Sequence, residues 1–313
     1  MSDTNASLAR KIHSAGDLQS VVRTMKALAA SSIGQYEQSA RALGDYYRTV
    51  ELGLGAYFRE KRNSSEGVLT NAPTPAGKAG GRVIGAVVFG SDQGLVGQFN
   101  DVVADYAVAA LAALPGQSQV WAVGERVQTR LTDAGVAVRG LFRVPNSAKA
   151  ITPLVGQILV EHEALHRTAA AAEPELHLYY NRLSSAAAGT NAVYVPVSQR
   201  LLPLDARWQH ELAALPWPTK VLPEILGGEQ AGVVTLRALI REYLFVSLFR
   251  ACAESLASEN ASRLAAMERA DRNIDDLLEE MNGRFHQLRQ SGIDAELFDV
   301  IAGFEALSSR GRR

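Results

Sequence analysis

The sequence predicts an α/β fold in which a long antiparallel coiled coil, formed by the two ends of the chain, stands on a Rossmann-like, mostly parallel α/β domain. The coiled coil is predicted because apolar residues recur in alternating steps of four and three near both ends of the chain. The sheet is predicted because short apolar runs alternate with helical patterns in the middle of the chain.

The first repeat lies in the N-terminal segment, which we expect to be one helix over residues 1–62. Its seam keeps the spacing without interruption at Ala29, Ile33, Tyr36, Ala40, Leu43, Tyr47, Val50, Leu54 and Tyr57. A helix with one apolar stripe must bury that stripe against a partner. The simplest partner is the helix at the other end of the chain.

The middle of the chain predicts a flexible loop, then an α/β domain, then a linker. The loop, 63–81, is rich in Gly, Pro and small polar residues, and the linker, 204–231, contains several prolines. The domain, 82–203, should end in an antiparallel edge strand. Its strands are expected at Arg82–Phe89, Val120–Val123, Val136–Phe142, Leu176–Arg182 and Ala192–Ser198, and its helices at Phe99–Leu114, Glu125–Ala134 and Lys149–Arg167.

The C-terminal segment, 232–313, carries the second repeat. Asp271 is the one polar residue at a seam position, and the spacing skips one residue near Gly292. Because this repeat is longer than the first, we expect the end of the C-terminal helix to project as a single helix. The apolar seam positions are Leu264, Met267, Ile274, Leu278, Met281, Phe285 and Leu288.

The composition sets limits on the class of protein. The 313 residues are 47% hydrophobic and 21% charged with a net charge of −1, which supplies a core and argues against nucleic acid as a partner. No apolar run approaches the ~20 residues of a membrane span, and we expect no secretory signal. The single cysteine, Cys252, is expected to be a buried structural thiol.

The turn Gly90–Gly97, between the first strand and the first helix of the middle domain, could hold an anion on its backbone amides. Its spacing fits neither GxGxxG nor GxxxxGK[ST], so the glycines more often serve backbone geometry. No cofactor is expected. A doubly wound nucleotide-binding enzyme that uses this turn remains one alternative, and a static coiled-coil scaffold remains another.

The segment His162–His166 matches HExxH, a helical zinc motif. No third ligand follows at a suitable spacing, and the surrounding helix has the apolar pattern of one packed on a sheet. We therefore expect no metal site, with both histidines on the solvated or boundary side of the helix.

The segment Ser255–Met267 contains the pattern SE-x-A-x-R-x-x-AM, and Ala270 and Asn273 follow it as A-x-x-N. This pattern resembles the C-terminal signature of the gamma subunit of F-type ATP synthases. Further segments resemble the family in the same order along the chain: Ile12–Ala30 of the opening helix, the turn Ser91–Gly97 with Asn100, Leu201–Leu204, and Arg289–Ile293.

The resemblance implies a non-catalytic central rotor shaft that couples rotation of the membrane c-ring to conformational cycling of the catalytic beta subunits. It implies one copy per complex, with alpha, beta and epsilon subunits and the c-ring as partners, peripheral to the cytoplasmic face of a bacterial plasma membrane. By residue-by-residue transfer, Arg289 and Gln290 would contact a loop of a beta subunit. Met25 and Lys26 would lie near its lever, and the turn residues Asp92, Gly94 and Gly97 would shape the foot domain.

Departures from the family pattern indicate a diverged branch. The opening helix has fewer basic residues than is usual, Gln93 stands where arginine is usual, and Gly292 interrupts the last helix. We expect Gly292 to loosen the tip without ending the helix. The sequence leaves open whether the coupling ion is the hydrogen ion or sodium, and whether the complex mainly makes or hydrolyses ATP.

Overall fold

The computed structural model describes residues 4–63, 83–168, 174–184, 193–221 and 228–310. The chain divides into two compact units, one formed by Met1–Ala29 with Leu264–Arg313 and the other by Ala30–Arg263. We call them unit 1 and unit 2. The loop expected over 63–81 falls almost wholly outside the described residues.

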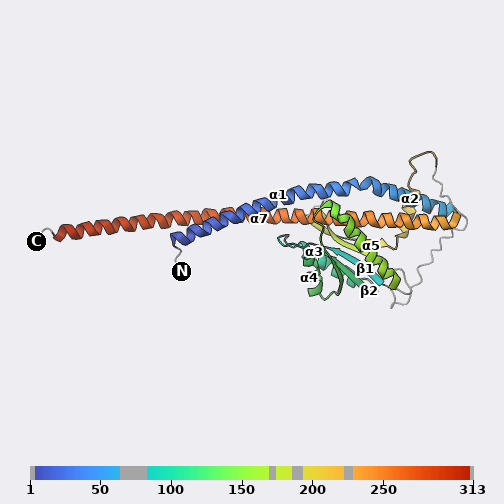
Figure 1. Ribbon diagram of the computed structural model, residues 1–313, viewed down its shortest axis with the longest axis horizontal. Helices are drawn as coiled ribbons and strands as arrows, with labels where there is room; N and C mark the ends of the chain where they lie inside the picture. The colour runs from blue at the N-terminus through green and yellow to red at the C-terminus, as the bar shows by residue number, and fades with distance from the viewer. Residues whose placement is uncertain (1–3, 64–82, 169–173, 185–192, 222–227, 311–313) are drawn as a thin grey trace. The chain divides into compact units, whose positions relative to one another are not determined.

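The two chain ends form long helices, as the repeats predict (Figure 1). The N-terminal segment is α1 (Asn5–Ala42) followed by α2 (Gly44–Asn63), and the C-terminal helix is α7 (Gly228–Arg310). The single N-terminal helix that we expected is therefore divided at Leu43, which lies in a turn. Gly44 follows at once, and glycine is among the weakest helix formers.

The middle of unit 2 is a five-stranded sheet with the order β3-β2-β1-β4-β5. All neighbours are parallel except β4 and β5, which confirms the predicted antiparallel edge strand. The strands are β1 (Val83–Phe89), β2 (Gln117–Val123), β3 (Val138–Phe142), β4 (Glu175–Leu183) and β5 (Tyr194–Leu202).

The sheet has an apolar layer on each face. Helices α3 (Phe99–Ala112) and α4 (Glu125–Asp133) cover one face, where Ile84, Ala86 and Val88 of β1 are buried. The other face packs against α5 (Ile151–Thr168), which follows the short 3₁₀ turn η1 (Ala148–Ala150), and against α1, α2 and α7. Successive side chains of a strand point to opposite faces, so β1 contributes to both layers.

The segment expected to be a linker contains a helix, α6 (Ala206–Ala214). The Asp205 carboxylate caps it by accepting a hydrogen bond from the Trp208 amide at 3.0 Å. The helix packs closely on α2, because a Cβ added at Gly55 would lie 2.4 Å from the carbonyl oxygen of Leu212. The segment between the sheet and α7 thus includes one short helix, which the sequence analysis did not predict.

In unit 1, the first part of α1 packs antiparallel on the stretch of α7 from Leu264 to Met281. Val22, Met267 and Ile274 form its buried centre, with Met25 and Leu278 beside them. The last buried seam residue of α7 is Met281, and of the described side chains from 282 to 302 only Phe285 is partly covered. We call residues 282–302 the tip. Within the described residues, none of the helices has an apolar stretch of membrane-spanning length.

Candidate functional site

The turn after β1 is held together by its own side chains. The Ser91 amide donates to Asn100 Oδ1 at 2.9 Å, and Asn100 Nδ2 donates to Ser91 Oγ at 2.8 Å. Both residues are buried. A buried pair that satisfies itself in this way fixes the path of the chain between β1 and α3.

The Asp92 carboxylate connects the turn to two other elements. One oxygen accepts the Glu125 amide at the start of α4 at 3.0 Å, and the other accepts the Val144 amide after β3 at 3.0 Å. A carboxylate at a helix N-terminus is also favoured by the helix dipole. Asp92 therefore aligns the carboxyl ends of the first three strands with α4.

The glycines of the turn differ in what their positions require. Gly97 has φ 57°, in the left-handed region that favours glycine. Gly94 has open space around it, since an added Cβ would approach only Arg126 Nη2, at 3.8 Å. The backbone thus explains a glycine at position 97, and nothing in the structure explains one at position 94.

Four backbone amides at and beside this turn donate to groups within the chain. Those of Gly90, Ser91, Glu125 and Arg126 donate to the Val123 carbonyl, Asn100 Oδ1, Asp92 Oδ1 and the Ser91 carbonyl respectively. The acidic Asp101 also lies in the first turn of α3. These contacts argue against the nucleotide-binding alternative.

The same turn contacts the signature segment of α7. Ser262 Oγ, which is buried, donates to the Val96 carbonyl at 2.6 Å. Leu95 beside it has φ 63°, an uncommon conformation for a residue with a side chain. The hydroxyl of Ser262 therefore ties the bent end of the turn to the long helix.

On either side of Ser262 in α7, Glu259 and Arg263 form a buried ion pair. Arg263 Nη2 lies 2.6 Å from Glu259 Oε1, and their side chains are only 11% and 7% exposed. Burial raises the pKa of Glu259, while the Arg263 charge opposes that rise. Neither Glu259 Oε2 nor Arg263 Nε has a hydrogen-bond partner among the described residues, so the pair is costly to bury.

Tyr36 of α1 and Cys252 of α7 complete this region. Burial, and then the charge of Glu259, raise the pKa of Tyr36. Burial likewise raises the pKa of the Cys252 thiol, which keeps it protonated and agrees with a structural role. Sequence reasoning named the signature residues without predicting this cluster, because the contact of the turn with α7 joins positions 166 residues apart.

In unit 1, the predicted contact residues Met25 and Lys26 lie in the helix pair. Met25 packs beside its apolar centre. Lys26 Nζ is 3.7 Å from Asp271 Oδ2, and Arg23 Nε is 3.1 Å from Asp271 Oδ1. Lys26 is thus partly engaged within the chain.

Arg289 and Gln290 lie on the tip, where both are exposed. Neither has a hydrogen bond or an ion pair to another described residue. Large apolar side chains are exposed on the same stretch, with Phe298 70% exposed. The tip therefore presents both polar and apolar groups that the chain itself leaves uncovered.

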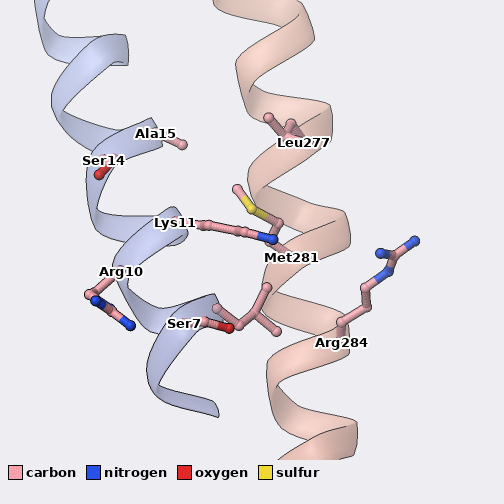
Figure 2. Close-up of a pocket in the computed structure, with 9 residues that line it drawn as sticks. Ser7, Arg10, Lys11, Ser14, Ala15, Leu277, Met281 and Arg284 are labelled. Atoms are coloured by element: carbon pink, nitrogen blue, oxygen red, sulfur yellow. The ribbon is translucent and has the colours of Figure 1, made fainter. Parts of the chain in front are cut away.

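A groove of about 630 Å³ opens where α1 begins, between it and α7. Figure 2 shows Lys11 extending from α1 towards Met281, while Arg10 and Arg284 point away from the helix pair. Arg284 Nη2 lies 2.5 Å from Glu280 on α7. The groove marks the point at which the α7 seam loses its partner.

The HExxH helix is α5, and the expected position of its first histidine was wrong. His162 is buried, because it follows Ile158 by four residues and so shares the apolar face of the helix. The side chain of His166 is outside the described residues. His177 on β4 pairs with Glu175 at 2.7 Å, which sequence reasoning missed. Among the described residues no group of three possible ligands could hold a metal.

These features define a protein with an α/β sheet domain in unit 2 and, in unit 1, an antiparallel pair of helices formed by the two ends of the chain. The ATP synthase family model matches residues 4–307, and the chain belongs to that family. The ATP synthase gamma chain of Clavibacter sepedonicus is 28% identical over 307 residues, covering 96% of each chain. That of Granulibacter bethesdensis is 25% identical over 303 residues, covering 95% of this chain and 97% of the relative.

Solved structures share the fold. A chain of the Euglena gracilis mitochondrial ATP synthase OSCP/F1/c-ring assembly has a TM-score of 0.63 at 16% identity, with coverage of 99% of this chain and 96% of that one. A chain of the rotor of the same enzyme has a TM-score of 0.58 at 14% identity, with coverage of 92% and 98%. The predicted fold class and the family resemblance are confirmed.

Proposed function

We propose that this chain is the central rotor shaft of an F-type ATP synthase and couples rotation of the membrane c-ring to conformational cycling of the catalytic beta subunits. The observation that carries the proposal is the change along α7, which is buried against the sheet domain in unit 2 and uncovered along the tip in unit 1. A helix whose end exposes Leu297, Phe298 and Val300 is built to meet another surface.

The mechanism requires no catalytic residue in this chain. A helix pair with a single projecting tip has no threefold symmetry, so it contacts three equivalent catalytic interfaces differently. A partner shifts a conformational equilibrium only by such differential contact. As the shaft rotates, the conformation that it favours at one catalytic interface becomes the one that it favours at the next.

Contact roles follow for four residues. Arg289 and Gln290 would contact a loop of a beta subunit, supported by their exposure without partners among the described residues. Met25 and Lys26 would lie near the lever of a beta subunit. Lys26 would then share its charge between Asp271 and that partner, since its side chain is 38% exposed.

The remaining partners follow from the same proposal. The sheet domain would be the foot on the c-ring beside epsilon, and the tip would enter the ring of alpha and beta subunits. One copy would serve each complex, peripheral to the cytoplasmic face of a bacterial plasma membrane. Asp92 and Gly97 would shape the foot domain from within.

The test is coupled ATP synthesis by membranes that carry the assembled complex. Replacing Arg289 and Gln290 with alanine should lower coupled turnover while the isolated subunit keeps its melting temperature, since surface truncations usually change stability by under ~0.5 kcal/mol. Arg269→Ala is the matched control, because it removes one exposed charge from α7 outside the tip. Unchanged turnover in the double variant would remove this pair from the mechanism.

A separate measurement addresses the enzyme alternative. Isothermal titration of ATP into the purified chain should give no binding, because the Gly90 and Ser91 amides are engaged and Asp101 places a negative charge in the first turn of α3. Stoichiometric binding that is lost when the turn is altered would favour the nucleotide-binding enzyme.

A further inference from the structure

An acidic residue lies inside the apolar seam of unit 1. Asp271 follows Met267 by four residues and precedes Ile274 by three, so it occupies a seam position, and its side chain is only 15% exposed. Arg23 Nε lies 3.1 Å from Oδ1 and Lys26 Nζ lies 3.7 Å from Oδ2. Both oxygens of a half-buried carboxylate thus face cations from the opposite helix.

A second acidic residue extends the contact by one helical turn. Asp275 Oδ1 lies 3.5 Å from Arg23 Nη2 and accepts a hydrogen bond from Gln19 Nε2. Arg23 therefore bridges the two carboxylates. We call Gln19, Arg23, Lys26, Asp271 and Asp275 the polar layer.

The polar layer interrupts an otherwise apolar contact. Val22, Met267 and Ile274 pack next to it, with Ala270 and Leu278 at its margin. An apolar residue in place of Asp271 would pack with these neighbours, and buried ion pairs are often less stable than such replacements. A polar residue at a seam position has a better attested effect, which is to specify the register of the two helices.

The ion pairs of Asp271 favour the observed register of α1 and α7 over the registers shifted by seven residues. An apolar seam repeats every seven residues, so it matches again when one helix slides by one repeat. Such a slip would place Asp271 opposite Gly16 and Gln19 in one direction and opposite Ala30 and Ile33 in the other. None of these residues carries a positive charge, so both slips would leave a carboxylate in the seam without a cation.

We propose that the polar layer is a register lock, which prevents α1 and α7 from sliding past each other in unit 1. The lock is a property of the isolated chain. In a rotating shaft, such a lock would keep the two helices from sliding along each other under torque. This consequence rests on the proposed function.

The experiment measures the distance between two spin labels on the isolated full chain. The labels are placed at Leu18→Cys and Leu277→Cys, both exposed on unit 1, in a Cys252→Ala background. The parent should give one narrow distance distribution. Asp271→Leu should broaden it and add distances displaced by up to ~10 Å, the rise of one seven-residue slip.

Two further variants complete the test. Asp276→Leu is the control, because Asp276 is exposed on the same helix and forms no ion pair with a described residue. Reversing all four charges, with Arg23→Asp, Lys26→Asp, Asp271→Lys and Asp275→Lys, should restore the narrow distribution. The proposal is overturned if Asp271→Leu stays as narrow as the parent, or if the control broadens equally.

A salt titration gives an independent readout that needs no substitution in the layer. Arg23 and Asp275 are largely exposed, so 1 M salt should screen part of the layer and broaden the parent distribution. Failure of the register lock would leave the proposed function standing, because no other subunit takes part in these measurements.

Discussion

Two stretches of the same helix, α7, are stabilised in opposite ways. Between Tyr243 and Ser262 most side chains are buried against the sheet and the N-terminal helices, and Leu248 and Ala253 are fully covered. Between Arg289 and Ala302 every side chain is exposed. The first stretch is helical because it packs, whereas the second has only its own backbone hydrogen bonds.

The comparison separates stability from function along one helix. Substitutions in the buried stretch should lower the free energy of unfolding and act on the assembled complex only through folding. Substitutions on the tip should leave folding intact and act on partners. The separation would be wrong if a substitution on the tip lowered the free energy of unfolding, or if one in the buried stretch left it unchanged.

The largest effect is expected at Leu248, which is fully buried among apolar neighbours of unit 2. Leu248→Ala should lower the free energy of unfolding by about 2–5 kcal/mol, the usual range for a buried leucine. The matched substitution on the tip, Leu297→Ala, should change it by under ~0.5 kcal/mol. Urea denaturation of both variants measures the difference, and similar values would erase the contrast.

The next effect tests the contact of α2 with α6. In Gly55→Ala the new methyl group would lie 2.4 Å from the Leu212 carbonyl oxygen, so backbone must move, at a cost of about 1–3 kcal/mol. Gly34→Ala on α1 is the control, because no atom lies within 4 Å of its added Cβ. It should stabilise the helix by about 0.5–1 kcal/mol. If both substitutions stabilise the chain, the close approach of α6 is wrong.

The buried pair Glu259–Arg263 predicts a pH dependence. Burial raises the pKa of Glu259, so the folded chain holds this proton at pH values where the unfolded chain has released it. The stability of the parent relative to Glu259→Gln should therefore fall as pH rises above about 4.3, by at most about 1.4 kcal/mol per unit. Urea denaturation of the parent and Glu259→Gln at several pH values measures the difference in their free energies of unfolding. If the parent gained stability relative to the variant as pH rises, the pKa of Glu259 would be lowered in the folded chain and not raised.

The smallest effect is expected at Gly292, where α7 continues as a helix and an added Cβ meets nothing within 4 Å. Gly292→Ala should stabilise the tip locally by about 0.5–1 kcal/mol. Hydrogen exchange of residues 288–296 should be fast in the parent and slower in the variant. If amide hydrogens of the tip exchanged as slowly as those of the buried stretch, the expected loosening of the helix at Gly292 would be refuted.

The sequence predicted the features that depend on periodicity. The two seams and the alternating strands and helices are local patterns that fix which faces are buried, and the mostly parallel sheet followed from them. The polar residue at position 271 was visible in the spacing as well. Its partners Arg23 and Asp275 were not, because the pairing depends on the register between the two helices.

The errors had local causes. The α6 helix was missed because prolines flank it, although the Asp205 cap was a usable signal. The division at Leu43 lies within an uninterrupted seam, so only Gly44 indicated it. His162 was expected on the solvated or boundary side of its helix, whereas its spacing from Ile158 places it on the apolar face.

The central claim is that this chain turns as a shaft. The most direct measurement is single-molecule rotation of a bead attached through Val193→Cys, an exposed position of unit 2, in a complex with immobilised alpha and beta subunits supplied with ATP. The proposal predicts unidirectional stepwise rotation that continues for many turns. A stoichiometric complex that hydrolyses ATP while the bead stays fixed would contradict it.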